Sequence, residues 1–290
     1  KQYESVRAFY EKADEALRFS LSDLIFQGPQ EKLTLTANAQ PALLTTSIAI
    51  MSRLQQFDIK LNYVAGHSLG EYSALVAGGM LDFEDAVCIV RKRGEFMEEA
   101  VPAGVGKMAA ILGLDRQLLE DITATVSANG TPVQLANINS PGQIVISGSA
   151  EGVTIACEKA KDNGAKRAIM LDVSGPFHSS LMKPAASDLR EAFAEFSWKD
   201  ASIPVVSNVN AKPITSADEM KEKLVQQLYS PVLWQDCVEH MIELGVDTFI
   251  EIGSGKVLSG LIKKINRSVK VYSVSNEKEI QAVVAALKEE

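Results

Sequence analysis

One segment of the chain combines a nucleophile with the small residues that a sharp turn needs. Residues 66–70 read Gly-His-Ser-Leu-Gly, which fits G-x-S-x-G, and they lie between an apolar run and a helix-like pattern. In a strand–turn–helix of this kind the serine, here Ser68, projects from the strand end at the helix N-terminus. We expect the tight turn to exclude a side chain at both Gly66 and Gly70. A Gly-rich turn that is merely capped by serine is the structural alternative.

The main chain after the serine could stabilise the negative charge that serine attack creates. The backbone N–H of Leu69 should point toward the same space as Ser68, where it can donate to an oxyanion formed on an attacked carbonyl. The helix dipole adds a favourable potential at that point. The pattern therefore predicts acyl chemistry at Ser68, with Leu69 as a main-chain donor.

A serine nucleophile needs an adjacent base, and the chain has three histidines. We expect the side chain of His67 to point away from its neighbour Ser68 and to support the turn. His240 lies in a helix-like stretch with acidic neighbours, which is typical of a solvated surface histidine. His178 follows Gly-Pro-Phe at 175–177, a loop signal after a strand. It is the best candidate for the base, although an ordinary loop histidine fits the same context.

Helical spacing distinguishes Arg93 from the two basic residues before it. Val90 and Met97 stand three and four residues from Arg93, which places it on the apolar arc, whereas Arg91 and Lys92 fall outside that arc. A buried arginine is costly unless it is paired. We therefore expect its partner to be either an internal carboxylate or the carboxylate of a ligand.

Other motifs in the chain do not carry a function of their own. The sequence Gly-Ser-Gly-Lys at 253–256 suggests a phosphate loop, but Ile250 stands where that motif needs glycine and Val257 where it needs Ser or Thr. No HxxxH, HExxH or CxxC pattern occurs, so we expect no metal site.

Composition places the chain among ordinary globular proteins. It has 290 residues, 46% of them hydrophobic and 23% charged, which excludes a disordered tail, a collagen and a small disulfide scaffold. The net charge of −8 makes nucleic acid and anionic membranes poor candidate partners. The three cysteines, Cys88, Cys157 and Cys237, are expected to be reduced. With no visible signal peptide or apolar span, we expect a cytoplasmic protein.

The elements that must position these groups follow from periodicity. Helices are predicted at 3–17, 41–57 with Pro41 in the first turn, 69–78, 83–100 and 235–244, and strands at 61–65, 203–206, 248–252 and 269–274. Between them, strands at 107–113, 133–137, 143–147 and 168–173 and helices at 116–126 and 152–163, with a turn at 139–142, give the order β-α-β-β-α-β, which is ferredoxin-like.

These patterns predict an α/β fold in two parts. Residues 1–103 and 174–290 should form a large, hydrolase-like catalytic subdomain, with a mostly parallel sheet that carries the nucleophile elbow. Residues 104–173 should form a small inserted ferredoxin-like subdomain.

Residues 66–75, Gly-His-Ser-Leu-Gly-Glu-Tyr-Ser-Ala-Leu, resemble the active-site segment of the malonyl-CoA:acyl carrier protein transacylases. Further stretches agree in order and spacing, and the similarity covers essentially the whole chain. These stretches are Arg-Lys-Arg-Gly at 91–94, Asn-Ser-Pro-Gly-Gln at 139–143, Gly-Pro-Phe-His-Ser at 175–179 and Glu-Ile-Gly-Ser-Gly-Lys-Val-Leu at 251–258.

The resemblance implies a role for each site residue. Ser68 would be the nucleophile and His178 the base. Arg93 would hold the free carboxylate of malonate through a bidentate pair. In this family a backbone carbonyl, from a glutamine before Leu-Tyr, replaces the carboxylate that orients the histidine of other serine hydrolases, and that glutamine is Gln227 here. Because the role belongs to the main chain, changing its side chain would be a weak test.

The resemblance also implies the reaction and its partners. A malonyl group would pass from malonyl-CoA to Ser68 and then to the phosphopantetheine thiol of acyl carrier protein, supplying fatty-acid synthesis without a cofactor. The carrier protein is acidic, so we expect a local basic patch to meet it. Candidates are Lys263, Lys264 and Arg267, or Lys166 and Arg167. We expect the enzyme to be a monomer.

Two other functions share part of this evidence. A serine thioesterase or esterase would share the elbow and release free malonate. The inferred burial of Arg93, the inserted pattern and the order Ser, Arg, His speak against it. A carrier-protein-binding module with weak activity is the second alternative, because family members begin with a strand and a Gly-Gln-Gly segment that supplies a second oxyanion donor. This sequence begins helix-like at Lys1 and has no Gly-Gln-Gly. We therefore predict a strand position beside the Ser68 strand that is vacant or otherwise filled.

Overall fold

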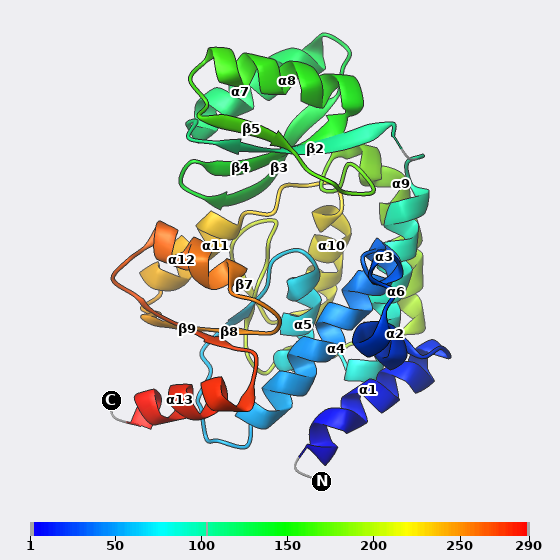
Figure 1. Ribbon diagram of the computed structural model, residues 1–290, viewed down its shortest axis with the longest axis vertical. Coiled ribbons are helices and arrows are strands. Elements are labelled where there is room, and N and C mark those ends of the chain that lie inside the picture. Colours follow the sequence, from blue (N-terminus) through cyan, green and yellow to red (C-terminus); the bar gives the residue numbers. More distant parts are fainter. Residues whose placement is uncertain (1–2, 103, 289–290) are drawn as a thin grey trace.

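The chain folds into a helix-rich body with a small four-stranded sheet at one end (Figure 1). This computed structural model describes residues 3–102 and 104–288. Lys1, from which the first helix was predicted, and residue 103, the proposed boundary, lie outside the described residues. No helix within the described ranges is both long enough and apolar enough to cross a membrane.

The small sheet has the predicted ferredoxin-like topology. It consists of β2 (Gly106–Leu112), β3 (Val133–Ser140), β4 (Gln143–Ser149) and β5 (Arg167–Met170), in the order β3-β4-β2-β5. All paired strands are antiparallel. The helices α7 (Arg116–Ala128) and α8 (Ala150–Asp162) cover its outer face (Figure 1). The turn was predicted at 139–142, but only residues 141 and 142 connect the strands, because β3 continues through Ser140. The division of the chain into two subdomains stays a prediction.

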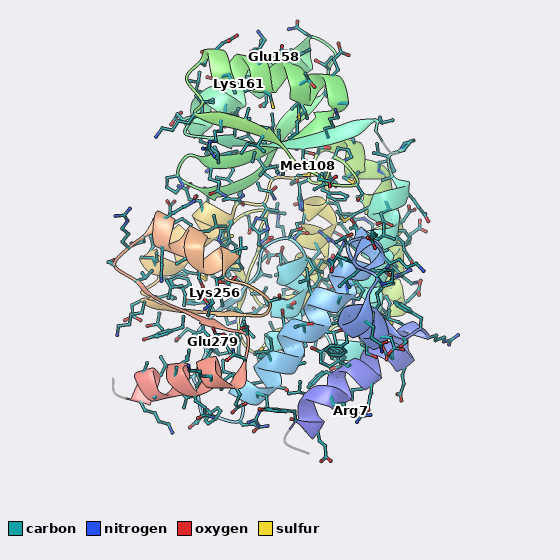
Figure 2. All side chains as sticks on the ribbon, in the orientation of Figure 1. Arg7, Met108, Glu158, Lys161, Lys256 and Glu279 are labelled. Atoms are coloured by element: carbon teal, nitrogen blue, oxygen red, sulfur yellow. The ribbon has the colours of Figure 1, made fainter. Side chains whose placement is uncertain are left out.

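The inner face of the small sheet packs against the body. Met108 of β2 is buried there with Phe177, in the segment that leads to His178. Figure 2 shows Met108 between the sheet and the body, whereas Glu158 and Lys161 lie on the outer side of α8. The sheet therefore forms a wall beside the His178 loop.

The body contains two small sheets where the sequence predicted one mostly parallel sheet. In the first, β1 (Val64–Ala65) pairs in parallel with β6 (Val205–Val206), which pairs antiparallel with β7 (Pro213–Ile214). In the second, β8 (Thr248–Ile252) pairs in parallel with β9 (Lys270–Val274). The parallel pairs agree with the prediction. The prediction of a single sheet is wrong, because β7 is antiparallel and β8 and β9 form a separate sheet.

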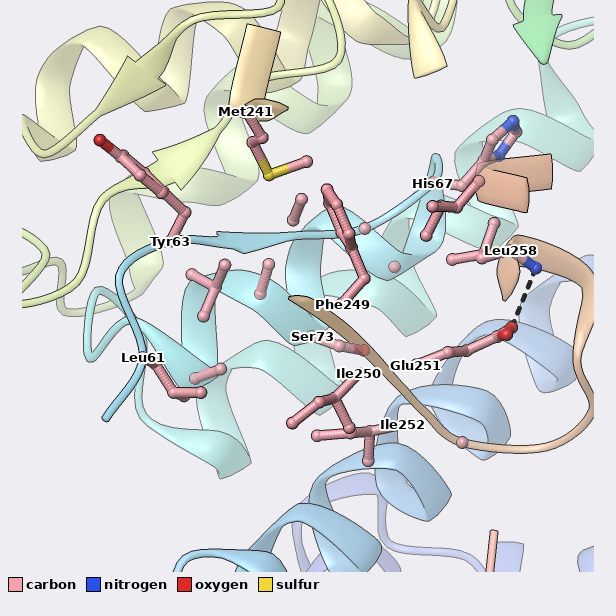
Figure 3. A pocket seen from close by; sticks show the side chains of 18 of the residues that line it. Leu61, Tyr63, His67, Ser73, Met241, Phe249, Ile250, Glu251, Ile252 and Leu258 are labelled. Carbon is pink, nitrogen blue, oxygen red and sulfur yellow. Dashed lines mark hydrogen bonds between the residues drawn. The ribbon is translucent and has the colours of Figure 1, made fainter. Parts of the chain in front are cut away.

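A largely apolar cavity of about 730 Å³ separates the two sheets of the body. Leu61 and Tyr63 beside β1 and Phe249 and Ile250 of β8 line it (Figure 3). Within residues 3–102 and 104–288, β6 is the only strand that pairs with β1. This pairing agrees with the predicted open strand position beside the Ser68 strand.

Helices surround these sheets. They are α1 (Glu4–Leu17), α2 (Leu21–Gln27), α3 (Gln30–Leu33), α4 (Thr36–Leu54), α5 (Leu69–Ala77), α6 (Phe83–Glu99), α9 (Lys183–Ala192), α10 (Ala217–Gln227), α11 (Trp234–Glu243), α12 (Val257–Ile265) and α13 (Glu277–Lys288), with 3₁₀ turns at Ser180–Met182 and Phe193–Glu195. The apolar faces of α1, α4, α5, α6 and α9 meet in the largest core cluster.

Helix α4 corrects the prediction for Pro41. The helix begins at Thr36, so Pro41 lies in its second turn instead of its first. Proline has no N–H for the carbonyl four residues earlier, which belongs to Ala37. Arg91 of α6 donates to that oxygen from Nη1, at 3.2 Å. Gly94 allows the close approach, since a Cβ there would lie 2.6 Å from the Cα of Ala37. This contact brings α6, and with it Arg93, against α4.

Candidate active site

Ser68 occupies a strained turn between β1 and α5. Its φ of 51° and ψ of −106° lie in a region that non-glycine residues rarely adopt. The backbone N–H of Ser68 donates to Oδ1 of Asn208 at 2.7 Å, and Nδ2 of Asn208 donates to the carbonyl of Gly66 at 2.8 Å. The side chain of Asn208 therefore holds both sides of the turn.

The two glycines of the turn differ in what they require. A Cβ on Gly66 would lie 2.0 Å from the carbonyl carbon of Gly70, so no side chain fits there. A Cβ on Gly70 would meet nothing within 4 Å, and its φ is not positive. The prediction is confirmed for Gly66 and wrong for Gly70, because the turn presses the backbone of Gly70 against the α-carbon of Gly66.

The predicted nucleophile and base lie within hydrogen-bond distance. Ser68 Oγ is 2.8 Å from Nε2 of His178, and Nδ1 of His178 is 2.7 Å from the main-chain oxygen of Gln227. A carbonyl oxygen only accepts hydrogen bonds, so Nδ1 must carry the proton. In the neutral imidazole, Nε2 is then left with its lone pair toward the hydroxyl of Ser68. This arrangement can remove a proton from Ser68.

The electrostatic surroundings keep His178 uncharged. Burial and, next, the positive charge of Arg93 lower the pKa of His178 to about 3, against an opposing hydrogen bond to the carbonyl of Gln227. The imidazole is therefore a free base at neutral pH.

Leu69 is the first residue of α5, and an N–H at that helical position has no carbonyl of its own helix to bind. It can therefore donate to a group bound beside Ser68.

Arg93 is buried, as its place on the apolar arc predicted, with 1% of its surface exposed. Its Nη1 donates to Oε1 of Gln40 at 2.5 Å, and its Nη2 donates to Oε1 of Gln227 at 2.9 Å and to Oγ of Ser68 at 3.1 Å. None of these partners is a carboxylate. The alternative of a direct internal salt bridge is thus not observed among the described residues.

Four groups at this site were missed by the sequence reasoning. They are the side chains of Gln40, Glu71, Asn208 and Gln227. Asn208 lies just beyond β6, which runs parallel to β1, and the carboxyl ends of parallel strands meet at one edge of a sheet. That signal could have found Asn208 from the sequence. Nothing local to Gln40 indicated its contact with Arg93.

Glu71 lies one turn along α5 from Ser68 and has no exposed surface. Its Oε1 accepts the backbone N–H of Asn208 at 3.2 Å, and its Oε2 accepts Nε2 of Gln227 at 2.5 Å. Burial raises the pKa of Glu71 to about 7, although these hydrogen bonds and the charge of Arg93 oppose the rise.

The other two histidines lie outside the catalytic contact. Nε2 of His67 is 2.8 Å from Oδ1 of Asn139 on β3, so its side chain links the turn to the small sheet, in keeping with the predicted supporting role. His240 is partly exposed and lies 3.2 Å from the carboxylate of Glu243. This fits the predicted surface histidine.

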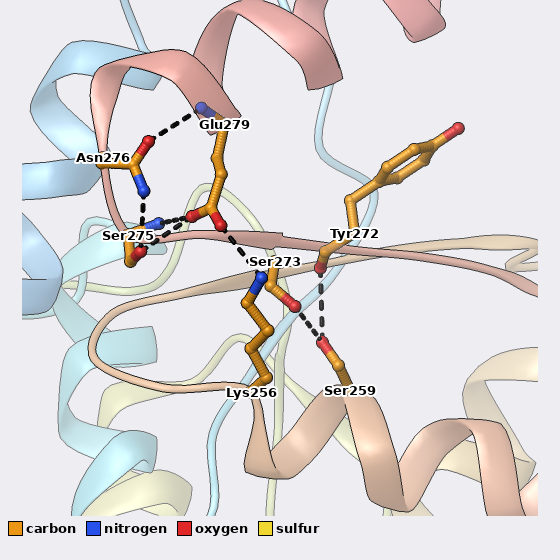
Figure 4. A network of polar contacts seen from close by, with 7 residues as sticks. All are labelled: Lys256, Ser259, Tyr272, Ser273, Ser275, Asn276 and Glu279. Carbon is orange, nitrogen blue, oxygen red and sulfur yellow. Dashed lines mark hydrogen bonds and ion pairs between the residues drawn. The ribbon is translucent and has the colours of Figure 1, made fainter.

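The loop that resembled a phosphate-binding motif is satisfied by acidic side chains. At the start of α12, Glu251 accepts the backbone N–H of Leu258 (Figure 3) and that of Ser259. Lys256 lies 3.0 Å from Glu279 (Figure 4). Carboxylates thus occupy both the helix N-terminus and the lysine that a phosphate would need.

Metal and disulfide chemistry have no visible support in the described part of the chain. No group of three or more His, Cys, Asp or Glu side chains there could hold a metal ion. Cys88, Cys157 and Cys237 are all free thiols.

Comparisons with known proteins identify the family of the chain. A family model described as "Acyl transferase domain" matches residues 2–289. The "Malonyl CoA-acyl carrier protein transacylase" of Bacillus subtilis (strain 168) is 57% identical over 290 residues, which is all of this chain and 92% of that protein. The crystal structure of an acyl-carrier-protein-S-malonyltransferase from Bartonella henselae has a TM-score of 0.95 at 44% identity, covering 99% of this chain and 92% of that one.

A second similar structure contains a bound partner. It is described as a type II PKS acyl-carrier protein in complex with its malonyl-transacylase, with a TM-score of 0.95 at 41% identity, covering 98% of this chain and 92% of that one. A family match over nearly the whole length and a relative of such high identity establish the relationship. The chain belongs to the acyl transferase domain family and, within it, to the malonyl CoA-acyl carrier protein transacylases.

Proposed function

We propose that this enzyme transfers the malonyl group of malonyl-CoA to the phosphopantetheine thiol of acyl carrier protein, and so supplies fatty-acid synthesis. The observation that carries the proposal is the 2.8 Å contact of Ser68 Oγ with His178 Nε2, beside a buried arginine that bonds no carboxylate among the described residues. Relatives with the same fold and high identity are described by the same activity.

The first half-reaction forms an ester on the enzyme. His178 accepts the proton of Ser68 as Oγ attacks the thioester carbonyl of malonyl-CoA, and the N–H of Leu69 donates to the oxyanion. The C–S bond then breaks, and the CoA sulfur takes the proton back from His178. A malonyl-Ser68 ester and free CoA result, with His178 neutral again.

The second half-reaction repeats these steps with the carrier protein. His178 accepts the proton of the phosphopantetheine thiol, whose sulfur attacks the ester carbonyl. The ester C–O bond breaks, and Ser68 recovers its proton from His178. Every proton returns to its starting group, so the transfer needs neither a cofactor nor an outside acid or base.

Arg93 is placed to bind the free carboxylate of the malonyl group. In malonate one methylene joins the two carboxyl carbons, so a cation that holds one of them must lie close to the atom that attacks the other. Nη2 of Arg93 lies 3.1 Å from Ser68 Oγ. A bidentate guanidinium–carboxylate pair fixes orientation as well as adding energy. An acetyl group offers no such contact, which gives a reason for acyl selectivity.

The family and the charge of the chain also suggest where the carrier protein docks and where the enzyme acts. The acidic carrier protein would dock on basic side chains, and we assign this to Lys263, Lys264 and Arg267, with Lys166 and Arg167 as the alternative patch. Lys264 lies beside the small sheet, where it donates to Gln143 at 2.9 Å. We infer a cytoplasmic monomer that acts on this protein partner and not on nucleic acid or a membrane, in line with its net charge of −8.

A product assay tests the proposal against its alternatives. The protein is incubated with malonyl-CoA, with and without phosphopantetheinylated carrier protein, and the products are identified by mass spectrometry. Malonyl-loaded carrier protein is the expected product. Free malonate formed at the same rate without carrier protein would indicate a thioesterase. Carrier-protein binding without any malonyl transfer would indicate a binding module.

A further inference from the structure

Two buried charges at the site are joined by one neutral amide. The side chain of Gln227 accepts from Arg93 Nη2 at Oε1, 2.9 Å away, and donates from Nε2 to Glu71 Oε2, 2.5 Å away. All three side chains have at most 1% of their surface exposed. The result is a continuous carboxylate–amide–guanidinium chain from α5 through the end of α10 to α6.

The orientation of that amide follows from the groups on its two sides. A guanidinium has only donors, so the group that faces Arg93 must be the oxygen of Gln227. An ionised carboxylate has only acceptors, and on the side of Glu71 the main-chain oxygen of Ser68 and Oδ1 of Asn208 also accept from Gln227 Nε2, at 3.1 Å and 3.2 Å. The carboxylate therefore requires the NH₂ group on its side. With the amide fixed at both ends, the oxygen that receives Arg93 has one position.

We propose that Glu71 is a positioning residue that acts through the side chain of Gln227 to aim Arg93, and that it thereby sets the preference for substrates with a free carboxylate. This inference rests on the proposed function, because it assumes that Arg93 binds the malonyl carboxylate. Glu71 touches neither substrate nor the reacting atoms in this arrangement. Its effect on selectivity would pass through two hydrogen bonds.

The chain of contacts gives a reason for using an amide between the charges. A buried guanidinium needs a counter-charge, but a direct ion pair would occupy the N–H groups that a ligand carboxylate must reach. Glu71 supplies the negative charge one side chain away, and among the described residues the hydrogen-bond acceptors of the guanidinium are the neutral oxygens of Gln40, Gln227 and Ser68. A substrate carboxylate would then be the first anion to contact Arg93 directly.

Glu71 also supports the turn that carries the nucleophile. It accepts from the backbone of Asn208, whose side chain accepts the N–H of Ser68. A loss through this second route would slow acylation by every substrate equally. The ratio of malonyl to acetyl transfer therefore distinguishes the two routes. The route through Gln227 and Arg93 changes this ratio, whereas a merely structural role through Asn208 does not.

The test measures kcat/KM for acylation of Ser68 by malonyl-CoA and by acetyl-CoA, at pH 8, where Glu71 is ionised. Glu71→Gln keeps the shape but cannot accept at both oxygens. We expect it to lower the malonyl-to-acetyl ratio by about tenfold or more, the scale of one charge-assisted hydrogen bond. An unchanged ratio, whether or not both rates fall, overturns the inference.

A second variant cuts the chain at its middle. Gln227→Met removes the amide and keeps the main-chain carbonyl that orients His178, so the inference can still be overturned even if Glu71→Gln does not fold. We expect the same fall in the ratio. An unchanged ratio in a folded Gln227→Met protein counts equally against the inference.

Two control variants distinguish a failure of this inference from a failure of the proposed function on which it rests. Leu75→Val trims a buried side chain of α5 and should lower the melting temperature with no change in the ratio. Arg93→Met should lower the ratio itself. If Arg93→Met leaves the ratio unchanged, the carboxylate clamp of the proposed function fails. If Arg93→Met lowers it and the Glu71 and Gln227 variants do not, only the role of Glu71 fails.

Discussion

Nδ1 of His178 lies 2.7 Å from the main-chain oxygen of Gln227, so a neutral carbonyl orients the imidazole. A carboxylate in this place would add a charge that favours the imidazolium. The carbonyl holds the same tautomer without adding that charge. The nearest formal charge with a marked effect on His178 is the positive Arg93, which acts in the opposite direction.

The first prediction concerns pH. Burial, followed by the charge of Arg93, lowers the pKa of His178 from 6.5 to about 3. A base works only when deprotonated, so activity falls as pH falls through its pKa. In Glu71→Gln, which removes the carboxyl whose pKa burial raises to about 7, the single-turnover rate of acylation by acetyl-CoA should therefore show no decline from pH 8 to pH 5. Removing the charge in Arg93→Gln should raise that pKa and shift the acid limb to higher pH. An inflection near pH 6.5 that persists in Glu71→Gln would contradict the assignment.

The second prediction concerns the nucleophile. Ser68→Ala should lose the malonyl adduct seen by intact-mass spectrometry after mixing with malonyl-CoA, and transfer should fall by about 10³-fold or more, because no covalent route remains. Ser73→Ala is the matched control, since it makes the same change one turn further along α5, facing the cavity. Persistent labelling of Ser68→Ala at another residue would reject the assignment.

The third prediction concerns Arg93. Arg93→Ala should lower kcat/KM for malonyl-CoA by about 10- to 150-fold, the equivalent of about 1.5–3 kcal/mol for a charged hydrogen bond, with a smaller effect on acetyl-CoA. Both substrates are measured with the same enzyme preparation. Lys92→Ala is the control, because Lys92 pairs with Glu195 at the surface. Equal losses with the two substrates would argue against a carboxylate clamp.

The fourth prediction concerns the two glycines. Gly66→Ala should prevent the turn from forming, because the new Cβ would collide with the backbone of Gly70. We expect no malonyl labelling and a lower melting temperature. Gly70→Ala should fold, and a gain of about 0.5–1 kcal/mol is expected for alanine in a helix. Circular dichroism melts of both variants provide the measurement, and similar melts for both would show that the contact at Gly66 is misjudged.

The fifth prediction concerns Asn208. Asn208→Ala removes the acceptor of the Ser68 N–H and the donor to the Gly66 carbonyl. Leaving buried groups unpaired costs about 1–3 kcal/mol, so both the unfolding free energy and the acylation rate should fall. Asn210→Ala, two residues along, loses only an exposed contact with the backbone of Lys212. If the two variants behave alike, Asn208 does not hold the turn.

The sequence alone was enough to identify those functional groups that their neighbouring residues mark out. The elbow at 66–70 has its own turn residues, and Arg93 shows its burial through its spacing from Val90 and Met97. The hydrophobic pattern was enough to predict the ferredoxin-like order of elements, because each strand and each helix there shows the periodicity of its own type. The role of His178 came from family resemblance, since its local context fitted an ordinary loop equally well.

The tertiary structure alone decided what surrounds those groups. Gln40 contacts Arg93 across 53 residues, and Gln227 contacts Glu71 across 156, so no local pattern could pair them. The side chain of Gln227, which the sequence argument set aside in favour of its carbonyl, proves to contact Arg93, Ser68, Glu71 and Asn208. The sequence specifies which side chains are available, but packing decides which buried donor meets which acceptor, because each must find a partner once water is excluded.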